Sequence, residues 1–268
     1  MRILIPVLDE ASILSETLAA LDMAFRRAWA IGSEKEKESL RTWEVWICDS
    51  GSRDASVELA RKFSSGSTRV VMRSRQVGAP NDQLSPGQCL ARTLEIPDSG
   101  KLFWIIPADC RVDEAAILGV VAWQTSAGLA PVGAFRKRYR DSGQGLTRIF
   151  LGLYARFLNQ VALRGQNQFV WTNAPFFRRL PQVRIPVGGF LEDLMLSDQF
   201  RALKKGFHVP GRGHVQVSAR LYRRDGFFRR VLRNSAILIR FRWLGEDVQS
   251  LRDRYRGLKR PVNSSIQN

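Results

Sequence analysis

The chain has 268 residues, of which 44% are hydrophobic, so it can bury a full core and is not expected to be disordered throughout. Its formal net charge of +17 favours polyanionic partners, such as nucleic acid, anionic lipid headgroups or phosphorylated small molecules. Three cysteines, Cys48, Cys89 and Cys110, are odd in number and lack metal-ligand spacing. This pattern argues against a disulfide framework or a zinc site and predicts a reducing, cytoplasmic location.

The first half of the sequence alternates short apolar runs, typical of strands, with longer stretches typical of helices. This alternation predicts an α/β fold with a mainly parallel, Rossmann-like sheet flanked by helices. The expected strands are residues 2–7, 43–48, 69–73, 102–106 and 132–136, and the expected helices are residues 11–30, 55–63, 88–94 and 114–125. Residues 32–39 (GSEKEKES) are expected to form a mobile charged insertion, and residues 78–87 a loop.

An uncharged run from Ala115 to Phe135 is long enough to span a bilayer. Polar and turn-forming residues, including Gln124 and Pro131, interrupt it in the middle. A buried helix, a turn and a buried strand are therefore favoured over a membrane span. The apolar run ILIPVL near the start is too short for a signal sequence, and acidic residues follow it, so no targeting peptide is expected.

The second half of the sequence has a different pattern. It predicts a helix around residues 150–161, a strand near Phe176, a loop at Gly188–Gly189, a helix over residues 191–205 and a strand over residues 214–219. Residues 227–244 predict a strongly basic helix, and residues 220–260 hold thirteen Arg and Lys against four acids. We therefore expect one domain over residues 1–225 and a basic helical extension over residues 226–268.

Acidic residues follow three of the expected parallel strands: Asp9 and Glu10, Asp49 to Asp54, and Asp109. Ligands of open parallel sheets bind at these carboxyl ends. Neither a GxGxxG motif nor a P-loop occurs, so neither a usual dinucleotide site nor a P-loop is supported. The carboxylates could instead accept hydrogen bonds from a base or ribose, or hold a divalent metal.

The segment CDSGSRD allows two interpretations. Ser52 and Asp54 suit the start of a helix, where a hydroxyl caps the helix and a carboxylate complements its positive end. Asp49 ends an apolar strand, where a carboxylate is costly without a partner, and this favours a ligand role. Glu192 and Asp193 open a later helix after a glycine pair; they fit either dipole complementation or catalysis.

Together these segments resemble a family 2 glycosyltransferase with the GT-A fold of nucleotide-diphospho-sugar transferases. ILIPVLDE resembles the opening strand of that family, CDSGSRDAS its D-G-S-x-D motif, and IIPADCRVDEAAI its DxD strand. GGFLEDLMLSDQF resembles the ED motif, and SARLYRRDGFFRR the Arg-rich segment that follows. The order and spacing match over nearly the whole chain, most closely to a small, soluble bacterial subgroup in which a single Asp replaces DxD.

The resemblance implies roles for individual residues. Asp49 would contact the nucleobase, with Pro6, Glu10 and Ser52 shaping the donor nucleotide pocket. Asp109 would approach a divalent cation, Mg²⁺ or Mn²⁺, bound to the diphosphate, and Asp193 would be the catalytic base beside Glu192. The cationic side chains expected to meet the diphosphate or the acceptor are Arg111, Arg220 and Arg223.

The sequence also departs from the family pattern. Cys110 and Arg111 follow Asp109 where the DxD motif has its second Asp, so the expected metal site is incomplete. Trp171, Thr172 and Asn173 replace a G-D-Q-like element, which leaves acceptor recognition open. His214 is either a late metal ligand or, more simply, a histidine at the surface or a strand edge.

The function that the resemblance implies is transfer of a sugar from a nucleotide-diphospho-sugar to an acceptor hydroxyl, with inversion. The acceptor is not specified, and a lipid-linked one is among the candidates. Two alternatives stay open: a nucleotidyltransferase of related fold, whose Gly-rich phosphate loop IPVLDEAS lacks, and a non-catalytic basic protein on a degenerate transferase fold. The latter would bind a membrane surface or nucleic acid, whereas no nucleic-acid partner is expected for the enzyme.

The basic helix over residues 227–244 has its own two interpretations. Arg229, Arg230, Arg233 and Arg240 share one helical face. That face is either solvated while the helix packs on the transferase domain, or it makes a peripheral contact with anionic lipid at the inner side of the membrane.

Overall fold

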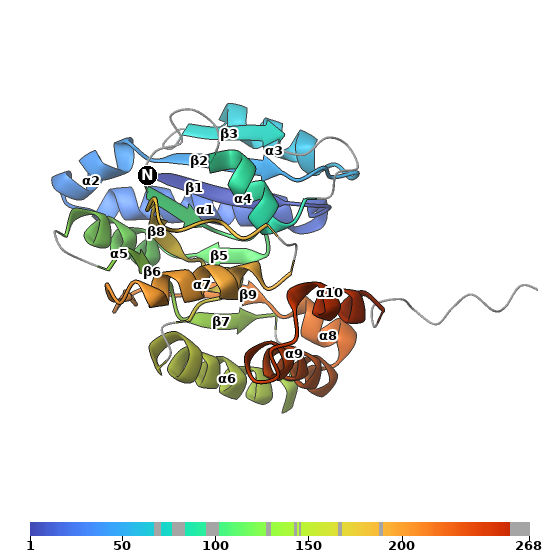
Figure 1. Ribbon diagram of the computed structural model, residues 1–268. Coiled ribbons are helices and arrows are strands. Elements are labelled where there is room, and N and C mark those ends of the chain that lie inside the picture. The colour runs from blue at the N-terminus through green and yellow to red at the C-terminus, as the bar shows by residue number, and fades with distance from the viewer. Residues whose placement is uncertain are drawn as a thin grey trace, which may run out of the picture.

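The computed structural model describes residues 1–66, 71–76, 84–94, 102–126, 130–141, 144, 146–165, 168–187 and 190–257. Its centre is a six-stranded sheet in the order β3-β2-β1-β4-β8-β6 (Figure 1). The strands are β1 (Arg2–Val7), β2 (Glu44–Asp49), β3 (Val71–Gln76), β4 (Leu102–Ile105), β6 (Val132–Gly133) and β8 (Phe176–Arg178). Strands β1 to β4 are parallel, and β8 pairs antiparallel with both β4 and β6.

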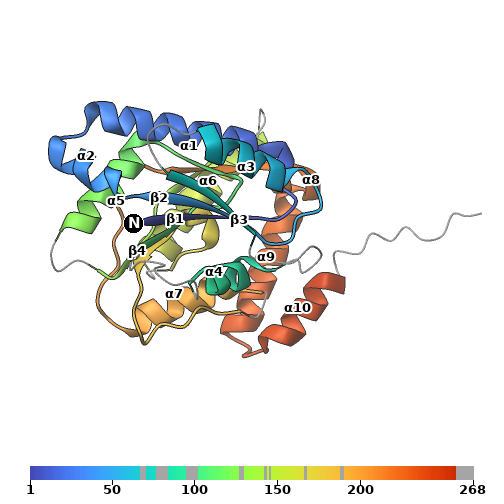
Figure 2. The same ribbon diagram turned by 90° about the horizontal axis from the view of Figure 1, so that it is seen from above.

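Both faces of this sheet are buried, which explains the continuous apolar runs of its strands. Ile3 and Ile5 point into one core cluster, and Leu4, between them, points into the other. The helices that cover the first face are α1 (Ala11–Ile31), α2 (Glu34–Arg41), α3 (Ser56–Gly66) and α5 (Glu114–Thr125). Helices α4 (Pro86–Leu94) and α7 (Glu192–Ala202) cover the second face (Figure 2).

A second, three-stranded sheet lies beside the first. It has the order β5-β9-β7, formed by β5 (Cys110–Val112), β9 (Val215–Ser218) and β7 (Lys137–Arg140). Helix α6 (Leu146–Leu158) packs on β7 and continues as a π-helical segment, Asn159–Gly165; a short 3₁₀ turn, Trp171–Asn173, follows. The described chain ends with α8 (Arg220–Asp225), α9 (Phe227–Arg242) and α10 (Val248–Gly257).

The predicted elements of the first half are confirmed, most with small shifts at their ends. The expected mobile insertion at residues 32–39 is wrong, because Ser33 begins helix α2 with a capping box. The Ser33 side chain accepts a hydrogen bond from the Glu36 amide at 3.4 Å, and Glu36 Oε2 accepts one from the Ser33 amide at 2.7 Å. Leu40 is buried beneath this helix. The Ser-x-x-Glu pattern, rather than the charge, decides the local structure.

The long uncharged run forms helix α5 and strand β6, as predicted. None of the helices in the described ranges is long and apolar enough to cross a membrane. Of the expected loop at residues 78–87, residues 78–83 lie outside the described residues, and α4 already begins at Pro86. The expected loop at Gly188–Gly189 lies outside them as well.

The strand order creates a switch point between β1 and β4. From β1 the chain builds β2 and β3 on one side of the sheet and then returns to place β4 on the other. Connections from β1 and β4 therefore diverge, leaving a crevice at their carboxyl ends where ligands of such sheets bind. Glu10 follows β1, and Asp109 follows β4.

Candidate active site

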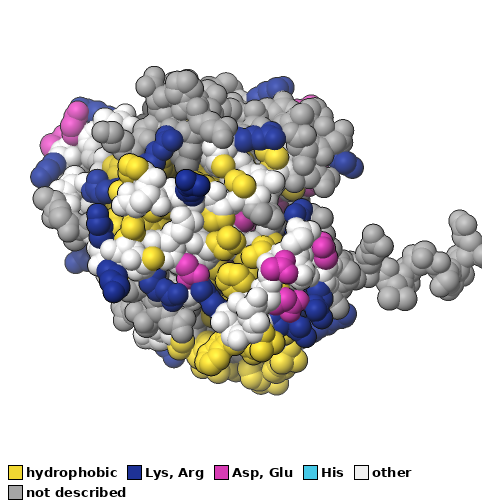
Figure 3. Space-filling view, viewed as in Figure 1, with side chains coloured by type: hydrophobic (Ala, Val, Ile, Leu, Met, Phe, Trp, Pro, Cys, Tyr) yellow, Lys and Arg dark blue, Asp and Glu magenta, His cyan; other side chains and the backbone are white. Residues whose placement is uncertain are grey.

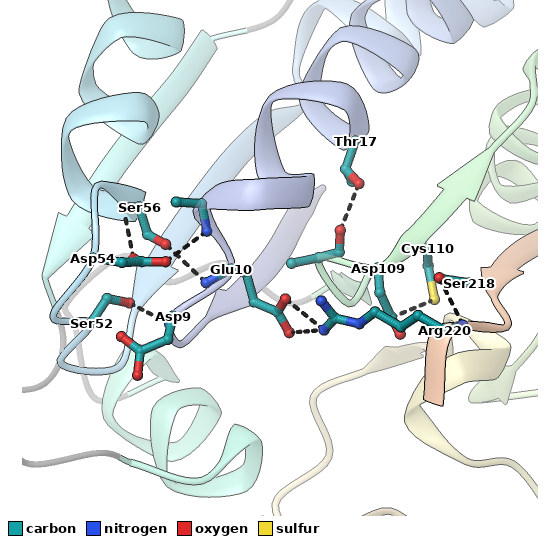
Figure 4. Close-up of polar contacts among 12 residues, drawn as sticks. Asp9, Glu10, Thr17, Ser52, Asp54, Ser56, Asp109, Cys110, Ser218 and Arg220 are labelled. Atoms are coloured by element: carbon teal, nitrogen blue, oxygen red, sulfur yellow. Dashed lines mark hydrogen bonds and ion pairs between the residues drawn. The ribbon is translucent and has the colours of Figure 1, made fainter. Parts of the chain in front are cut away.

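Hydrogen bonds join the loop after β1 to the loop after β2 (Figure 4). The Asp9 amide donates to Ser52 Oγ at 3.0 Å, and the Arg53 amide donates to Asp9 Oδ1 at 2.7 Å. Asp9 adopts a φ of 53°, a left-handed conformation that Asp tolerates better than most residues. The predicted donor-site residue Ser52 thus fixes the position of the neighbouring strand tip.

Asp54 links the starts of two helices. Its Oδ1 accepts a hydrogen bond from the Ser56 amide at 3.0 Å, and its Oδ2 accepts one from the Ala11 amide at 2.9 Å. Partial burial disfavours the charged form, but bonds from Ser56 and Ala11 outweigh it and lower the pKa of Asp54. The helix-start interpretation of Asp54 therefore fits the structure, with the addition that it also caps α1, whose own N-cap residue makes no side-chain cap.

Asp49 is buried at the end of β2, with 2% of its surface exposed. Its carboxylate accepts hydrogen bonds from the amides of Gly51 at 3.0 Å and Ser52 at 3.2 Å. Gly51 has a φ of 97°, which glycine adopts without strain. The partner that a buried carboxylate requires is therefore supplied by its own turn, and contact with a nucleobase stays a proposal.

Glu10 and Arg220 form the polar centre of the switch point. Arg220 Nη2 lies 2.7 Å from both carboxylate oxygens of Glu10, and the two residues are 210 positions apart (Figure 4). Burial raises the pKa of Glu10, and the Arg220 guanidinium opposes this effect. The pair joins the tip of β1 to the start of α8. Glu10, predicted for the donor nucleotide pocket, and Arg220, predicted for the diphosphate or the acceptor, are thus in direct contact.

Asp109 lies beside this pair, and its backbone carbonyl accepts a hydrogen bond from the Ser218 amide at 3.2 Å. Within the described ranges, no three His, Cys, Asp or Glu side chains could together hold a metal ion. The Glu10 oxygens contact Arg220, and burial raises the pKa of the Cys110 thiol well above its usual range, aided by Asp109. A hard cation at Asp109 would therefore need most of its ligands from phosphate and water.

His214 lies in a different place from this centre. Its Nδ1 is 3.5 Å from Asp113 Oδ2, at the start of α5, and burial lowers its pKa. The structure thus pairs His214 with Asp113, as expected for a histidine near a strand edge.

A cavity of about 380 Å³ brings Asp109 and Asp193 together. Asp193 is the second residue of α7. Leu191, which directly precedes this helix, has a φ of 52°, a costly conformation for leucine. The other polar or aromatic side chains in the wall include Lys137, Tyr139, Thr172, Asn173, Tyr222 and Arg230. The wall thus combines two carboxylates with cationic groups from the second sheet and α9.

Glu192 is buried at the start of α7 and contacts the start of α4. Its Oε1 accepts a hydrogen bond from Ser85 Oγ at 2.6 Å, and its Oε2 accepts one from the Gly87 amide at 2.8 Å. A Cβ at position 87 would lie 2.5 Å from Glu192 Cδ, so only glycine allows this approach. Glu192 therefore joins α7 to the start of α4, and it is not among the residues that line the cavity in the described part of the chain.

Lys137 was not predicted from the sequence. It is 5% exposed, burial lowers its pKa to about 8, and Cys110 and Asp193 oppose that shift. Its Nζ lies 3.4 Å from Thr172 Oγ1. The segment FRKRYR held a signal for it, since alternation places Phe135, Lys137 and Tyr139 on one side of a strand.

Tyr139 and Tyr222 form a neutral part of the cavity wall. The Tyr139 hydroxyl donates to the Tyr222 hydroxyl at 3.2 Å, and burial, with Tyr222 beside it, raises the pKa of Tyr139 far above its usual range. Arg230 lies over the Tyr222 ring at 5.6 Å.

The remaining predicted residues lie elsewhere. Arg111 contacts Glu16 on α1, and Arg223 is exposed; neither is among the residues that line the cavity within the described ranges. Pro6 lines a small apolar cavity with Cys48 and Cys89, under the tips of β1 and β2. Thr172 and Asn173 line the cavity that holds Asp109 and Asp193, whereas the Trp171 side chain lies outside the described part.

No family model and no curated protein matches the chain. Among solved structures, it is similar to S. aureus TarS 1-349 in complex with UDP-GlcNAc, at 12% identity and a TM-score of 0.53 over 81% of this chain and 58% of that one. A second structure, S. aureus TarS 1-349, has 13% identity and a TM-score of 0.55 over 89% of this chain. The chain spans 65% of that second structure, so it covers less than two thirds of either.

At 12–13% identity, the similarity to these structures shows the fold alone. The predicted α/β class is confirmed, whereas membership of family 2 stays a prediction. The chain has the GT-A-type fold of glycosyltransferases.

Proposed function

We propose that the protein is an inverting glycosyltransferase of family 2 type, which moves a sugar from a nucleotide-diphospho-sugar to an acceptor hydroxyl. One observation carries the proposal: a single cavity holds Asp109, from the β4 side of the switch point, together with Asp193. A site for this reaction needs charge stabilisation at the diphosphate and a base at the acceptor.

Asp193 is the proposed base. As the acceptor oxygen attacks the anomeric carbon, its proton passes to the Asp193 carboxylate and the bond from that carbon to the diphosphate oxygen breaks. A single displacement inverts the anomeric centre. Glu192 acts as a positioning residue, because its bonds to Ser85 and Gly87 hold the start of α7 against α4.

The leaving diphosphate requires positive charge. Lys137 and Arg230 line the cavity, and Arg220 lies beside Asp109. When bound at Asp109, Mg²⁺ or Mn²⁺ would neutralise further charge on the leaving group. Arg111 and Arg223 would have to change their positions to contribute.

The donor nucleotide is proposed to lie along the tips of β1 and β2. Asp49 is held rigidly by two amides, and its remaining lone pairs can accept hydrogen bonds from N–H groups of the base. Pro6, Glu10 and Ser52 would complete this wall.

Donor turnover tests the proposal. A set of UDP-, GDP-, CDP- and dTDP-sugars is incubated with the protein, and release of nucleoside diphosphate is measured. Asp193→Asn should keep donor affinity but lower turnover by about 10²-fold or more, as expected when a general base is lost. The matched control is Asp22→Asn on the outer side of α1. Turnover of Asp193→Asn equal to that of this control would remove Asp193 from the mechanism.

A further inference from the structure

Most of the exposed large hydrophobic side chains in the described chain lie on two helical segments. We define the α6–α9 surface by these residues: Leu146, Ile149, Leu153, Phe157 and Val161 of α6 and its π-helical continuation, and Phe228, Leu232, Ile239 and Trp243 of α9 and its end. Figure 3 shows hydrophobic side chains gathered at the lower edge of the molecule, where Figure 1 places α6 and α9. Exposed apolar residues scattered singly are ordinary, but a contiguous group marks an interaction site.

The apolar residues form one stripe on each helix, opposite to the side that packs inward. On α6, Leu151 and Ala155 are buried, whereas Leu153 and Phe157 are exposed. On α9, Arg230, Asn234 and Ile237 line the cavity, whereas Leu232, Ile239 and Trp243 are exposed. Each helix therefore turns one side inward and leaves a second, apolar face exposed.

Aromatic contacts hold the two stripes side by side. Phe150 of α6 stacks on Phe227 at 5.8 Å and meets Phe228 edge-on at 5.3 Å. Trp243 is 84% exposed and Leu232 is 70% exposed, so these side chains are far from shielded by their neighbours.

The charged side chains of the two helices themselves are all cationic. The sequences of α6 and α9 contain no Asp or Glu, and Arg156 and Arg229 are exposed near the stripes. A second copy of the chain would bring an equally cationic rim to the same surface, and like charges would face each other across a two-fold interface. An anionic lipid surface satisfies both the apolar stripes and the arginines.

The arginines expected to carry a lipid contact do not form a free basic face. Arg230 and Arg233 bind Asp225 at 2.6 and 3.1 Å, and Arg240 binds Glu246 at 3.0 Å. Of the four predicted residues, Arg229 is the exposed one. Charge on this helix face therefore cannot supply the docking energy by itself.

We propose that the α6–α9 surface docks on an anionic bilayer, with its apolar stripes in the interface and its arginines at headgroup phosphates. The opposite side of α9 lines the cavity that holds Asp109 and Asp193. Docking thus keeps this cavity about one helix diameter, on the order of 10 Å, from the lipid surface. If the proposed function holds, the acceptor hydroxyl is one carried by a membrane lipid; the docking itself does not depend on that function.

Vesicle binding tests the docking. The full chain is sedimented with vesicles of phosphatidylcholine alone or with 30% phosphatidylglycerol, and tryptophan emission is followed in parallel, with Trp243→Phe identifying the part due to Trp243. We expect binding to the anionic vesicles with a blue shift of the emission, and partial retention at high salt. Leu153→Ser with Leu232→Ser should weaken binding about tenfold or more, since both side chains enter the interface.

The matched control is Met23→Ser with Ile31→Ser, which removes two exposed apolar side chains of α1. It should bind vesicles as the wild type does, and unfolding transitions of both double variants should match the wild type. Equal binding by both double variants, complete loss of binding at high salt, or no vesicle binding together with self-association would overturn the proposal. Donor turnover measured without vesicles reports on the catalytic proposal separately, and we expect it to be unchanged in both double variants.

Discussion

At the scale of single residues, the chemistry of the candidate site depends on which polar side chains are buried and which already have partners. Asp49 was expected to need a ligand because it is a carboxylate at the end of an apolar strand, yet the amides of Gly51 and Ser52 satisfy it. Lys137 shows the opposite case: alternation in FRKRYR places it beside Phe135 and Tyr139, but only the fold shows that this side of the strand is buried. The sequence could locate carboxylates at strand ends, but it could not show which of them already have partners.

Lys137 gives a prediction for stability and turnover together. Because a buried ammonium is desolvated, Lys137→Met should raise the free energy of unfolding at pH 7 by about 1–3 kcal/mol. Turnover should fall about tenfold or more, since the cavity loses a charge near the leaving diphosphate. The matched control, Arg138→Met, removes an exposed charge from the next position of β7. A loss of stability in Lys137→Met beyond that of Arg138→Met would contradict the argument.

The lowered pKa of Lys137 predicts how stability and turnover depend on pH. In the folded protein this pKa is about 8, below the value of about 10.4 expected when unfolded, so the unfolded chain binds more protons between these values. Wild-type stability should therefore gain a contribution as pH rises from 8 to 10, and Lys137→Met should lack that gain. Turnover should decline over the same range as the ammonium is lost. Urea denaturation at pH 7, 8, 9 and 10 measures the free energy of unfolding of the wild type and of Lys137→Met. Parallel plots of this free energy against pH for the two proteins would refute the prediction.

At the scale of elements, the sequence predicted the parts whose pattern is local. Strand β1 and helix α5 lie where their apolar periodicity places them. The second sheet was only partly predicted, through β9, because β5 has three residues and β7 reads KRYR, so neither shows an apolar pattern. Both exist through pairing with β9, which lies far along the chain. Helix α2 was missed because its charges were weighed and its capping box was not.

Glu192 tests the junction of α4 and α7. Glu192→Ala should cost about 1–3 kcal/mol of unfolding free energy, because it leaves the Gly87 amide without its acceptor. Glu192→Gln keeps one acceptor oxygen and should cost less, with turnover staying within about tenfold of the wild type, as a positioning residue allows. Thermal unfolding and donor turnover, measured for both variants, distinguish a positioning role from a chemical one. A fully stable Glu192→Gln with a much larger loss of turnover would instead assign Glu192 to the chemistry.

At the scale of the whole molecule, the candidate site is assembled from segments that meet only in the folded chain. Asp109, Lys137, Asp193 and Arg230 come from a strand end, a second sheet, a helix start and the basic helix. Arg242 binds Asp198 at 2.5 and 2.8 Å and so fixes α9 against α7. Helix α9, predicted as part of an extension of the domain, also forms part of the cavity wall. Such convergence depends on tertiary packing, which no single segment of the sequence encodes.

If the proposed function holds, a nucleoside diphosphate binds at the switch point between β1 and β4. Isothermal titration of UDP, GDP, CDP, ADP and dTDP, with and without Mn²⁺, tests it most directly, using the wild type, Asp109→Ala and the surface control Asp22→Asn. We expect saturable binding of at least one of them to the wild type and the control, strengthened by Mn²⁺. In Asp109→Ala the Mn²⁺ effect should be lost, with affinity down about tenfold or more, as for removal of a charged ligand contact. Absence of binding by all five to the wild type, or unchanged Mn²⁺-dependent binding in Asp109→Ala, would contradict the account.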